Sequence, residues 1–436
     1  MKLAINGGKP VREKPFPAHI TIGSEEKKEV MKVLDSGILS RYLGSWHEYF
    51  YGGPQVRALE EEWAEFFRVK HAVAVNSCTS GLICAVGATG VEPGEEIIVP
   101  PYTMSATATA PIIFNAVPVF ADIDEDYFCI NLDSIEKHIT SRTRAIIVVN
   151  LFGQSYDAER INALAAKHGL YVIEDAAQAP AATNGGRFVG TLGSIGVYSL
   201  NFHKHIHCGE GGIIVTNDDH LADRVRLIRN HAEAVVEAKG SAAEVNMIGF
   251  NFRMQEIEAA IARCQLKKLP GFLEKRLAHV SYLEKALSDI PAIIAPKVRE
   301  GCKHVYYVHA CKFREEIAGV SRNQFVKAVA AELPPFELRE SEGAKISSGY
   351  VKPLYLQPLF QNKRAYGTQG CPFTRPWYEG QVDYSKGICP VTERMHEKEL
   401  FMHEFMVPSL RKADLDDVAA AFHKVWENRN ELKPGV

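Results

Sequence analysis

Short apolar runs alternate with helix-like segments through the first half of the chain. The runs occupy residues 72–75, 96–100, 116–121, 144–150, 170–175 and 213–216. Apolar runs of this length that alternate with helices are typical of parallel strands buried on both faces. The pattern therefore predicts a doubly wound α/β lobe, in which helices cover both faces of a sheet.

Helical patterns precede, separate and follow these runs. The predicted helices span residues 24–36, 56–67, 81–89, 158–168, 219–231, 254–288, 320–332 and 415–430, and a further strand falls within 304–315. Gly169 directly follows one of these helices and suits a C-cap. Residues 333–395 are irregular and rich in Pro, Gly and Tyr. We expect a large lobe at 1–255 and a smaller lobe at 256–436, with no flexible linker between them.

Composition limits the partners and the compartment. The 436 residues suffice for two lobes, since single cores stop growing near roughly 250–300 residues. A net charge of −3 offers no basic field for nucleic acid or an acidic membrane. The start lacks the apolar core of a signal peptide, and no apolar run approaches the roughly 20 residues of a membrane span. Nine cysteines without a disulfide framework indicate reduced thiols. We expect a cytoplasmic protein that binds neither nucleic acid nor membrane.

Reactive residue types follow the predicted strands. Cys78 and Thr79 come after the first apolar run, at a helix start where free backbone N–H groups attract a phosphate. Asp175 ends another strand, and Tyr102 follows a third. Lys204 precedes a glycine-rich stretch at 209–212. Because ligands of open α/β sheets bind beyond the carboxyl ends of the strands, we expect these side chains to meet in one site.

These residue types are the ones that pyridoxal phosphate (PLP) chemistry requires. A carboxylate such as Asp175 holds the pyridine nitrogen protonated, so that the ring can accept electrons. A lysine such as Lys204 forms a Schiff base with the cofactor aldehyde and later carries a proton. The phosphate needs hydroxyls and amides, which are available at Cys78, Thr79 and Ser199. Each residue alone has a plainer explanation, such as a solvated charge or a helix cap. Their occurrence together at strand ends of one lobe favours the cofactor site.

Three histidines alternate around the lysine, at His203, His205 and His207. A strand there would put the three rings on one face, and a zinc site is one interpretation. No carboxylate or cysteine stands at a recognisable ligand spacing, so we expect no metal. Local hydrogen bonds or a contact with substrate are the alternative roles. Further polar candidates around a pocket are Arg229, Arg253, His309 and His396.

Six stretches, at residues 76–79, 99–103, 173–179, 198–212, 249–254 and 389–394, read as motifs of one family. They resemble the DegT/StrS family of PLP-dependent sugar aminotransferases, in the fold type I, aspartate aminotransferase-like superfamily. The Asp-Ala-Ala-Gln sequence at 175–178, followed by Lys204 and Gly-Glu-Gly-Gly, is highly specific, and the resemblance covers about residues 5–425. It implies a PLP-binding large lobe with a mostly parallel, seven-stranded-type sheet flanked by helices, plus a smaller α+β C-terminal lobe.

The resemblance also implies roles for individual residues. Lys204 forms the Schiff base, Asp175 pairs with the pyridinium nitrogen, Gln178 lies by the ring, and Tyr102 stacks on it. Cys78, Thr79 and Ser199 bind the phosphate. Asn251 reaches the phosphate in the neighbouring subunit, which implies a homodimer with shared active sites. Cys78 stands where glycine is usual, but a cysteine keeps its backbone N–H and serves unless that position needs a positive φ.

The implied reaction moves an amino group from glutamate or glutamine to a keto or aldehyde carbon of a sugar-type substrate. The acceptor stays open between a nucleotide keto sugar, a keto-inositol and an oxidised eight-carbon sugar acid. These belong to amino sugar, polysaccharide or antibiotic biosynthesis. A PLP-dependent keto-deoxysugar dehydratase is an alternative, but those relatives carry histidine where Lys204 stands. A non-enzymatic regulator with the same fold is another, and it would be expected to lack Lys204 or Asp175.

Overall fold

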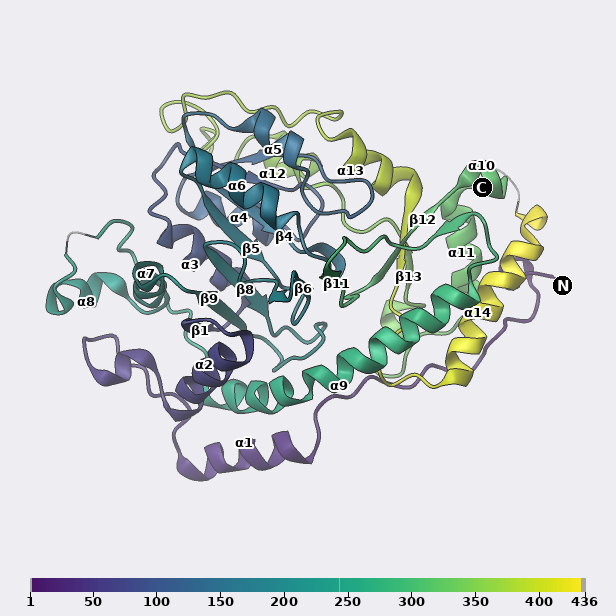
Figure 1. The fold of residues 1–436 in the computed structure, drawn as a ribbon, viewed down its shortest axis with the longest axis horizontal. Helices are drawn as coiled ribbons and strands as arrows, with labels where there is room; N and C mark the ends of the chain where they lie inside the picture. The colour runs from purple at the N-terminus through teal and green to yellow at the C-terminus, as the bar shows by residue number, and fades with distance from the viewer. Residues whose placement is uncertain (1, 243, 433–436) are drawn as a thin grey trace.

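A computed structural model of the protein describes residues 2–242 and 244–432, and its largest sheet has seven strands. In sheet order these are β1 (His71–Val75), β9 (Gly212–Thr216), β8 (Ile195–Ser199), β5 (Tyr171–Asp175), β4 (Thr143–Val149), β2 (Glu96–Val99) and β3 (Val117–Phe120). β9 pairs antiparallel with β1 and β8, and the other pairs are parallel. The predicted mostly parallel sheet is confirmed (Figure 1).

Helices cover both faces of this sheet, because side chains along each strand alternate between two apolar cores. One core receives Ile97 and Ile147 and is closed by α3 (Cys78–Ala88), α4 (Ala106–Ile113) and α7 (Asp219–Arg229). The other receives Ile146 and Ile213 and is closed by α2 (Pro54–Phe67), α5 (Leu132–His138), α6 (Ala158–His168) and α9 (Glu256–Ala286). α1 (Ser24–Ser36) contacts α9, and α8 (Ala232–Lys239) follows α7.

The smaller lobe is built on a second sheet, which is antiparallel. Its strands, in order, are β10 (Ile293–Ile294), β12 (His309–Phe313), β14 (Leu400–His403) and β13 (Ile346–Ser348). Its core gathers Phe313, Phe325, Phe401 and Phe422 between this sheet, α11 (Arg322–Glu332) and α14 (Lys412–Glu427). Short elements complete the chain: β6 (Thr183–Asn184), β7 (Arg187–Phe188), β11 (Cys302–Lys303), α10 (Glu315–Ala318), α12 (Pro358–Gln361) and α13 (Pro390–Arg394). The predicted smaller α+β lobe is thus present.

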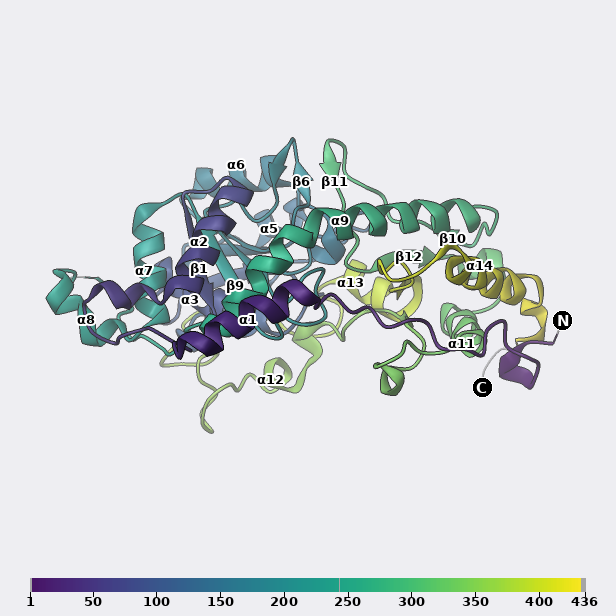
Figure 2. The same cartoon turned by 90° about the horizontal axis from the view of Figure 1, so that it is seen from below.

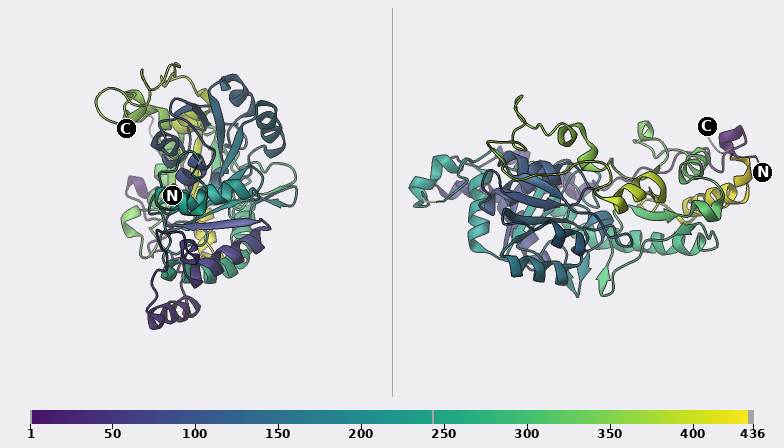
Figure 3. Two further views of the ribbon diagram at one scale, coloured as in Figure 1. Left: turned by 90° about the vertical axis from the view of Figure 1, so that its left-hand side faces the viewer. Right: turned by 90° about the horizontal axis from the view of Figure 1, so that it is seen from above.

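Two segments of the chain each pack on the lobe to which most of their sequence neighbours do not belong. The N-terminal segment runs from α1 along the smaller lobe toward α14 (Figure 2), and Leu3 and Phe16 lie in that lobe's core. Residues between α12 and α13 lie over the large lobe (Figure 3), and Phe373 and Tyr384 join its core. The division at residue 255 stays a prediction, since α9 is one continuous helix that contacts both α2 and α14.

Among the described residues, none of the helices combines the length and apolar character needed to cross a membrane.

Candidate active site

A cavity of about 350 Å³ lies at the carboxyl ends of β5 and β8. Most of the side chains that the sequence predicts for the site line it, namely Cys78, Thr79, Asp175, Gln178, Ser199 and Lys204. They come together because the strands that carry Asp175 and Ser199 are parallel neighbours. The chain therefore brings a buried carboxylate, a lysine amine and a helix N-terminus to one space.

Asp175 is 5% exposed and held in a fixed orientation. Its Oδ2 accepts a hydrogen bond from the Thr107 hydroxyl at 3.0 Å, and its Oδ1 accepts one from the Ala177 backbone N–H at 3.1 Å. Burial raises the pKa of this carboxyl, and the two hydrogen bonds and the charge of Lys204 work against that rise. A carboxylate in this setting gains from a cationic partner in the cavity, because the interaction takes place away from water.

The N-terminus of α3 forms a cradle for an anion. The Ser77 side chain caps the helix by accepting from the Ser80 backbone N–H, and Ser80 in turn donates to Asn76 at 2.7 Å. Cys78 is the first helical residue and has no positive φ, so glycine is not needed there. Gly212 is needed in the neighbouring strand, because a Cβ there would lie 2.8 Å from the Cys78 backbone nitrogen. The free N–H groups of this first turn suit a phosphate.

Lys204 lies in a turn after β8. Its backbone N–H donates to the Asn201 carbonyl at 2.9 Å, and its Nζ stands 4.4 Å from the centroid of the Tyr307 ring. Burial and the charge of Asp175 raise the pKa of the Cys78 thiol, while Lys204 lowers it, so all three groups share one electrostatic environment.

The structure places Tyr102 behind the cavity, and its predicted stacking on the cofactor stays a prediction. This residue is fully buried, its hydroxyl accepts the Tyr350 backbone N–H at 2.7 Å, and within the described chain it does not line the cavity. Met104, two residues later, lines the cavity and is 60% exposed. Gln178 is fixed by the Phe152 N–H at 2.7 Å and by the Tyr350 hydroxyl at 3.0 Å.

Several other candidates lie outside this cavity. Asn251 is exposed and accepts from Arg253 at 2.7 Å, and its predicted role in a neighbouring subunit stays a prediction. Arg229 is buried against Glu60 at 2.7 Å, an internal ion pair. His309 is buried between Glu284 and His403, and His396 packs near Tyr102. Arg229, His309 and His396 thus contact neighbouring side chains and do not line this cavity.

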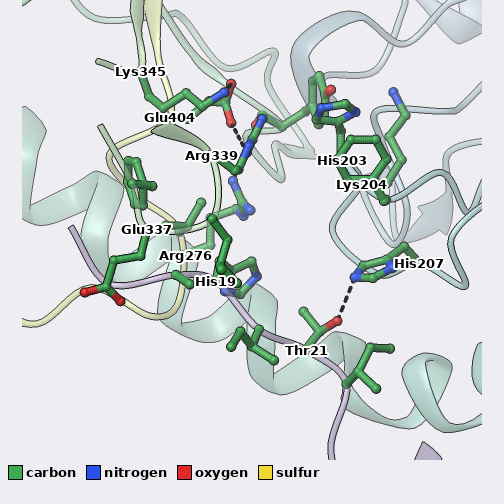
Figure 4. A pocket seen from close by; sticks show the side chains of 18 residues that line it. His19, Thr21, His203, Lys204, His207, Arg276, Glu337, Arg339, Lys345 and Glu404 are labelled. Atoms are coloured by element: carbon green, nitrogen blue, oxygen red, sulfur yellow. Dashed lines mark hydrogen bonds and ion pairs between the residues drawn. The ribbon is translucent and has the colours of Figure 1, made fainter. Parts of the chain in front are cut away.

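A second cavity, of about 270 Å³, adjoins the first and shares His203, Lys204 and Tyr307 with it. Its other walls come from residues 18–22, Arg276 of α9, residues 336–339, Lys345 and Glu404 (Figure 4). Sequence reasoning missed this wall, because its residues come from distant segments and no motif joins them. Burial, with the charges of Arg276, His207 and Arg339, lowers the pKa of His19 to about 4, so this ring is neutral at pH 7.

The alternating histidines do not share one face, since residues 201–208 form turns instead of a strand. His205 is buried and its Nε2 lies 3.0 Å from the Val305 carbonyl oxygen. His207 lies 2.9 Å from the Thr21 hydroxyl in the second cavity, and His203 lines both cavities. Across the described residues, no three His, Cys, Asp or Glu side chains are grouped as metal ligands.

Comparisons with known proteins agree on one family. The model of the DegT/DnrJ/EryC1/StrS aminotransferase family matches residues 21–384. Spore coat polysaccharide biosynthesis protein SpsC of Bacillus subtilis is 32% identical over 93% of this chain and 95% of its own length. L-glutamine:2-deoxy-scyllo-inosose aminotransferase of Streptomyces kanamyceticus is 30% identical over 99% of this chain and 98% of its own. An aminotransferase structure from Psychrobacter cryohalolentis superposes with a TM-score of 0.78 at 28% identity, covering 95% and 99% of the two chains.

Proposed function

Because this chain belongs to the DegT/DnrJ/EryC1/StrS aminotransferase family, we propose that it uses PLP to move an amino group from glutamate or glutamine to a sugar-type carbonyl. The observation that carries the proposal is the single cavity lined by Asp175, Lys204 and the N-terminus of α3. A relative that had become a non-enzymatic regulator would have no need to keep this set together.

The residues of the cavity fit PLP. The first turn of α3, with the hydroxyls of Thr79 and Ser199, suits the phosphate, and the close approach permitted by Gly212 keeps this cradle open. Asp175 lies on the same cavity wall as a partner for the ring nitrogen. Met104 offers an exposed, polarisable side chain for the ring face, the place that the sequence assigns to Tyr102.

When bound, PLP supplies an electron sink for the amino-group transfer. Asp175 would keep the proton on the ring nitrogen, since Thr107 and the Ala177 N–H hold its two oxygens in position. Lys204 would hold the cofactor through its aldehyde and, as a free amine, would move a proton at the reacting carbon. Tyr307 packs beneath the Lys204 amine and restricts where it can reach.

Membership of the family supports an amino donor and a sugar-type acceptor without naming either compound. The name of the Streptomyces kanamyceticus relative gives L-glutamine as donor and 2-deoxy-scyllo-inosose as acceptor. That of the Bacillus subtilis relative places it in polysaccharide biosynthesis. For this chain we keep glutamate and glutamine as donors, and a nucleotide keto sugar, a keto-inositol or an oxidised eight-carbon sugar acid as acceptors. We further propose a cytoplasmic homodimer in which Asn251 reaches the partner's site.

The visible absorption spectrum of the purified protein tests the function directly. We expect a band of bound PLP that bleaches when glutamate or glutamine is added. The Lys204→Ala variant should keep its fold and lose this response, because the lysine acts in chemistry and not in packing. Bleaching that persists in this variant would contradict the assignment. A band that ignores both donors would favour a dehydratase, and no band even with added PLP would favour a regulator.

A further inference from the structure

The second cavity, beside Lys204, contains a buried guanidinium that forms no ion pair with any described carboxylate. Arg276 of α9 lines this cavity and is 6% exposed. Its Nη1 donates to the backbone carbonyls of Tyr306 and Tyr307, at 3.0 and 3.4 Å. Within the described chain it forms no ion pair within 4.0 Å, although Glu404 is near enough to raise its pKa. A buried charge of this kind is costly unless an opposite charge joins it.

The other charged side chains that line the cavity are paired, face elsewhere or serve the cofactor, so Arg276 is the remaining cation that lacks an ion pair among the described residues. The lining contains four cationic side chains and two carboxylates. Arg339 pairs with Glu342 at 2.7 Å and with Glu404 at 3.3 Å, and Lys345 pairs with Glu342. Glu337 points away from the arginines (Figure 4). Lys204, the fourth cation, serves the cofactor.

Burial lowers the pKa of Arg276 to about 10, so it still carries its charge at neutral pH. His19 beside it is neutral at that pH and can donate or accept a hydrogen bond. One unpaired arginine with a neutral imidazole suits a single negative charge. A guanidinium also matches the two oxygens of a carboxylate in a forked arrangement. A diphosphate would bring a larger negative charge beside Glu404.

We propose that this second cavity is the carboxylate-binding subsite of the enzyme, with Arg276 as the residue that pairs with a carboxylate of a reactant. The proposal rests on the aminotransferase function above, because Lys204 forms the shared wall of both cavities and brings the bound reactant to the reacting group. The carboxylate comes either from the amino donor or from a sugar-acid acceptor. Exposed apolar side chains at Ile20, Phe202 and Leu338 line the same cavity and suit the carbon skeleton of such a reactant.

Isothermal titration calorimetry on the PLP-loaded protein tests the proposal with unreactive probes. Glutarate represents the donor, D-glucuronate represents a sugar-acid acceptor, and UDP represents a nucleotide. We expect Arg276→Gln to weaken binding of one carboxylate probe about 30-fold or more, because it removes one partner of a desolvated charge pair. The probe that loses affinity identifies the source of the carboxylate. Lys267→Gln, on the exposed side of the same helix, is the matched control and should change nothing.

A second pair of variants guards against misfolding, because Arg276 also holds two backbone carbonyls. Arg276→Lys keeps the charge and should recover part of the affinity. Glu404→Gln leaves Arg276 intact, removes a negative charge from the wall, and should tighten carboxylate binding about 2- to 5-fold. Thermal melting reports whether each variant is folded.

The proposal is overturned if neither carboxylate probe binds the wild type, or if folded Arg276→Gln binds both as the wild type does. A loss of UDP affinity larger than the loss for the carboxylates would assign the cavity to a phosphate instead. If Arg276→Gln does not fold, unchanged carboxylate affinity in Glu404→Gln overturns it. Bleaching of the PLP band by glutamate in the wild type separates these results from failure of the aminotransferase function itself.

Discussion

Replacing Asp175 by asparagine is the sharpest test of how the cavity works. The change keeps the shape of the side chain and removes its charge. The amide oxygen can still accept from Thr107, whereas the amide NH₂ would face the Ala177 N–H. That conflict costs about 1 kcal/mol, which a folded protein of this size tolerates. We therefore expect the variant to fold.

The effect on rate follows from the burial of Asp175. At 5% exposure it is largely shielded from water, so under the proposed function its pairing with the ring nitrogen would take place away from solvent. Removing one partner of such a buried pair costs about 3–5 kcal/mol. Each 1.36 kcal/mol is tenfold in rate, so turnover should fall about 10²- to 10⁴-fold. Cofactor affinity should fall much less, because the phosphate cradle and Lys204 are unchanged.

The assay is a single turnover in which glutamate bleaches the PLP band, combined with a PLP titration of the same variant. Asp122→Asn is the matched control. Asp122 is also buried, at 8% exposure, and accepts from the Thr392 N–H and hydroxyl at 3.0 and 2.7 Å, but it lies outside the cavity. The Asp122→Asn variant should be less stable than the wild type and should keep the wild-type turnover rate. An unchanged rate in Asp175→Asn, or an equal loss in the control, would show that the Asp175 charge has no part in the chemistry.

Three further predictions concern the cradle, the ring face and pH. Gly212→Ala should weaken PLP affinity about 10-fold or more, because its Cβ displaces the backbone amides at the start of α3. Gly271→Ala, with open space around it, is the control, and equal PLP affinities of the two variants would contradict phosphate binding at α3. Met104→Ala should weaken PLP binding about 2- to 10-fold, whereas Tyr102→Phe should lower the melting temperature and leave PLP affinity unchanged. The reverse result would show that Tyr102, and not Met104, contacts the PLP ring. Burial and the charge of His309 lower the pKa of His304 to about 3. Between about pH 6.5 and pH 3 the unfolded chain therefore binds a proton at His304, whereas the folded chain does not. Urea unfolding should therefore show stability falling from pH 6.5 toward 3, with a smaller fall in His304→Asn; identical pH profiles would refute this.

Periodicity predicted the elements best where the local signal was unbroken. The helices at 24–36 and 158–168 match the structure residue for residue, and Gly169 adopts the left-handed conformation of a C-cap. The strand β8 was missed because Gly196 interrupts its apolar run. A Cβ at Gly196 would lie 1.9 Å from the Gly190 carbonyl oxygen, so the close approach of the preceding turn selects this glycine. A search for apolar periodicity does not detect that contact.

The same limit applies to the candidate site. Asp175 could be placed in the site from the sequence, because parallel strands deliver their carboxyl ends to one edge, and Lys204 could be placed there by the glycine-rich stretch that follows it. The burial of Tyr102 behind the cavity could not be predicted, since it depends on a hydrogen bond to Tyr350, 248 residues away. The role proposed for Arg276 could not be predicted for a similar reason. Its helix is one of several helical segments, and its cavity is assembled from residues far apart in the chain.

The packing of the N-terminal segment has a consequence for how the chain folds during synthesis. The Leu3 N–H donates to Glu431, 428 residues later, and Ala4 donates to Glu332. Leu3 and Ala4 leave the ribosome long before these partners and can pair with them only after the partners have emerged. The seven-stranded sheet can form while they are still unpaired, and the smaller lobe closes only after α14 has emerged. The final docking step is therefore a contact of very high sequence separation, which makes it slow compared with the local steps before it.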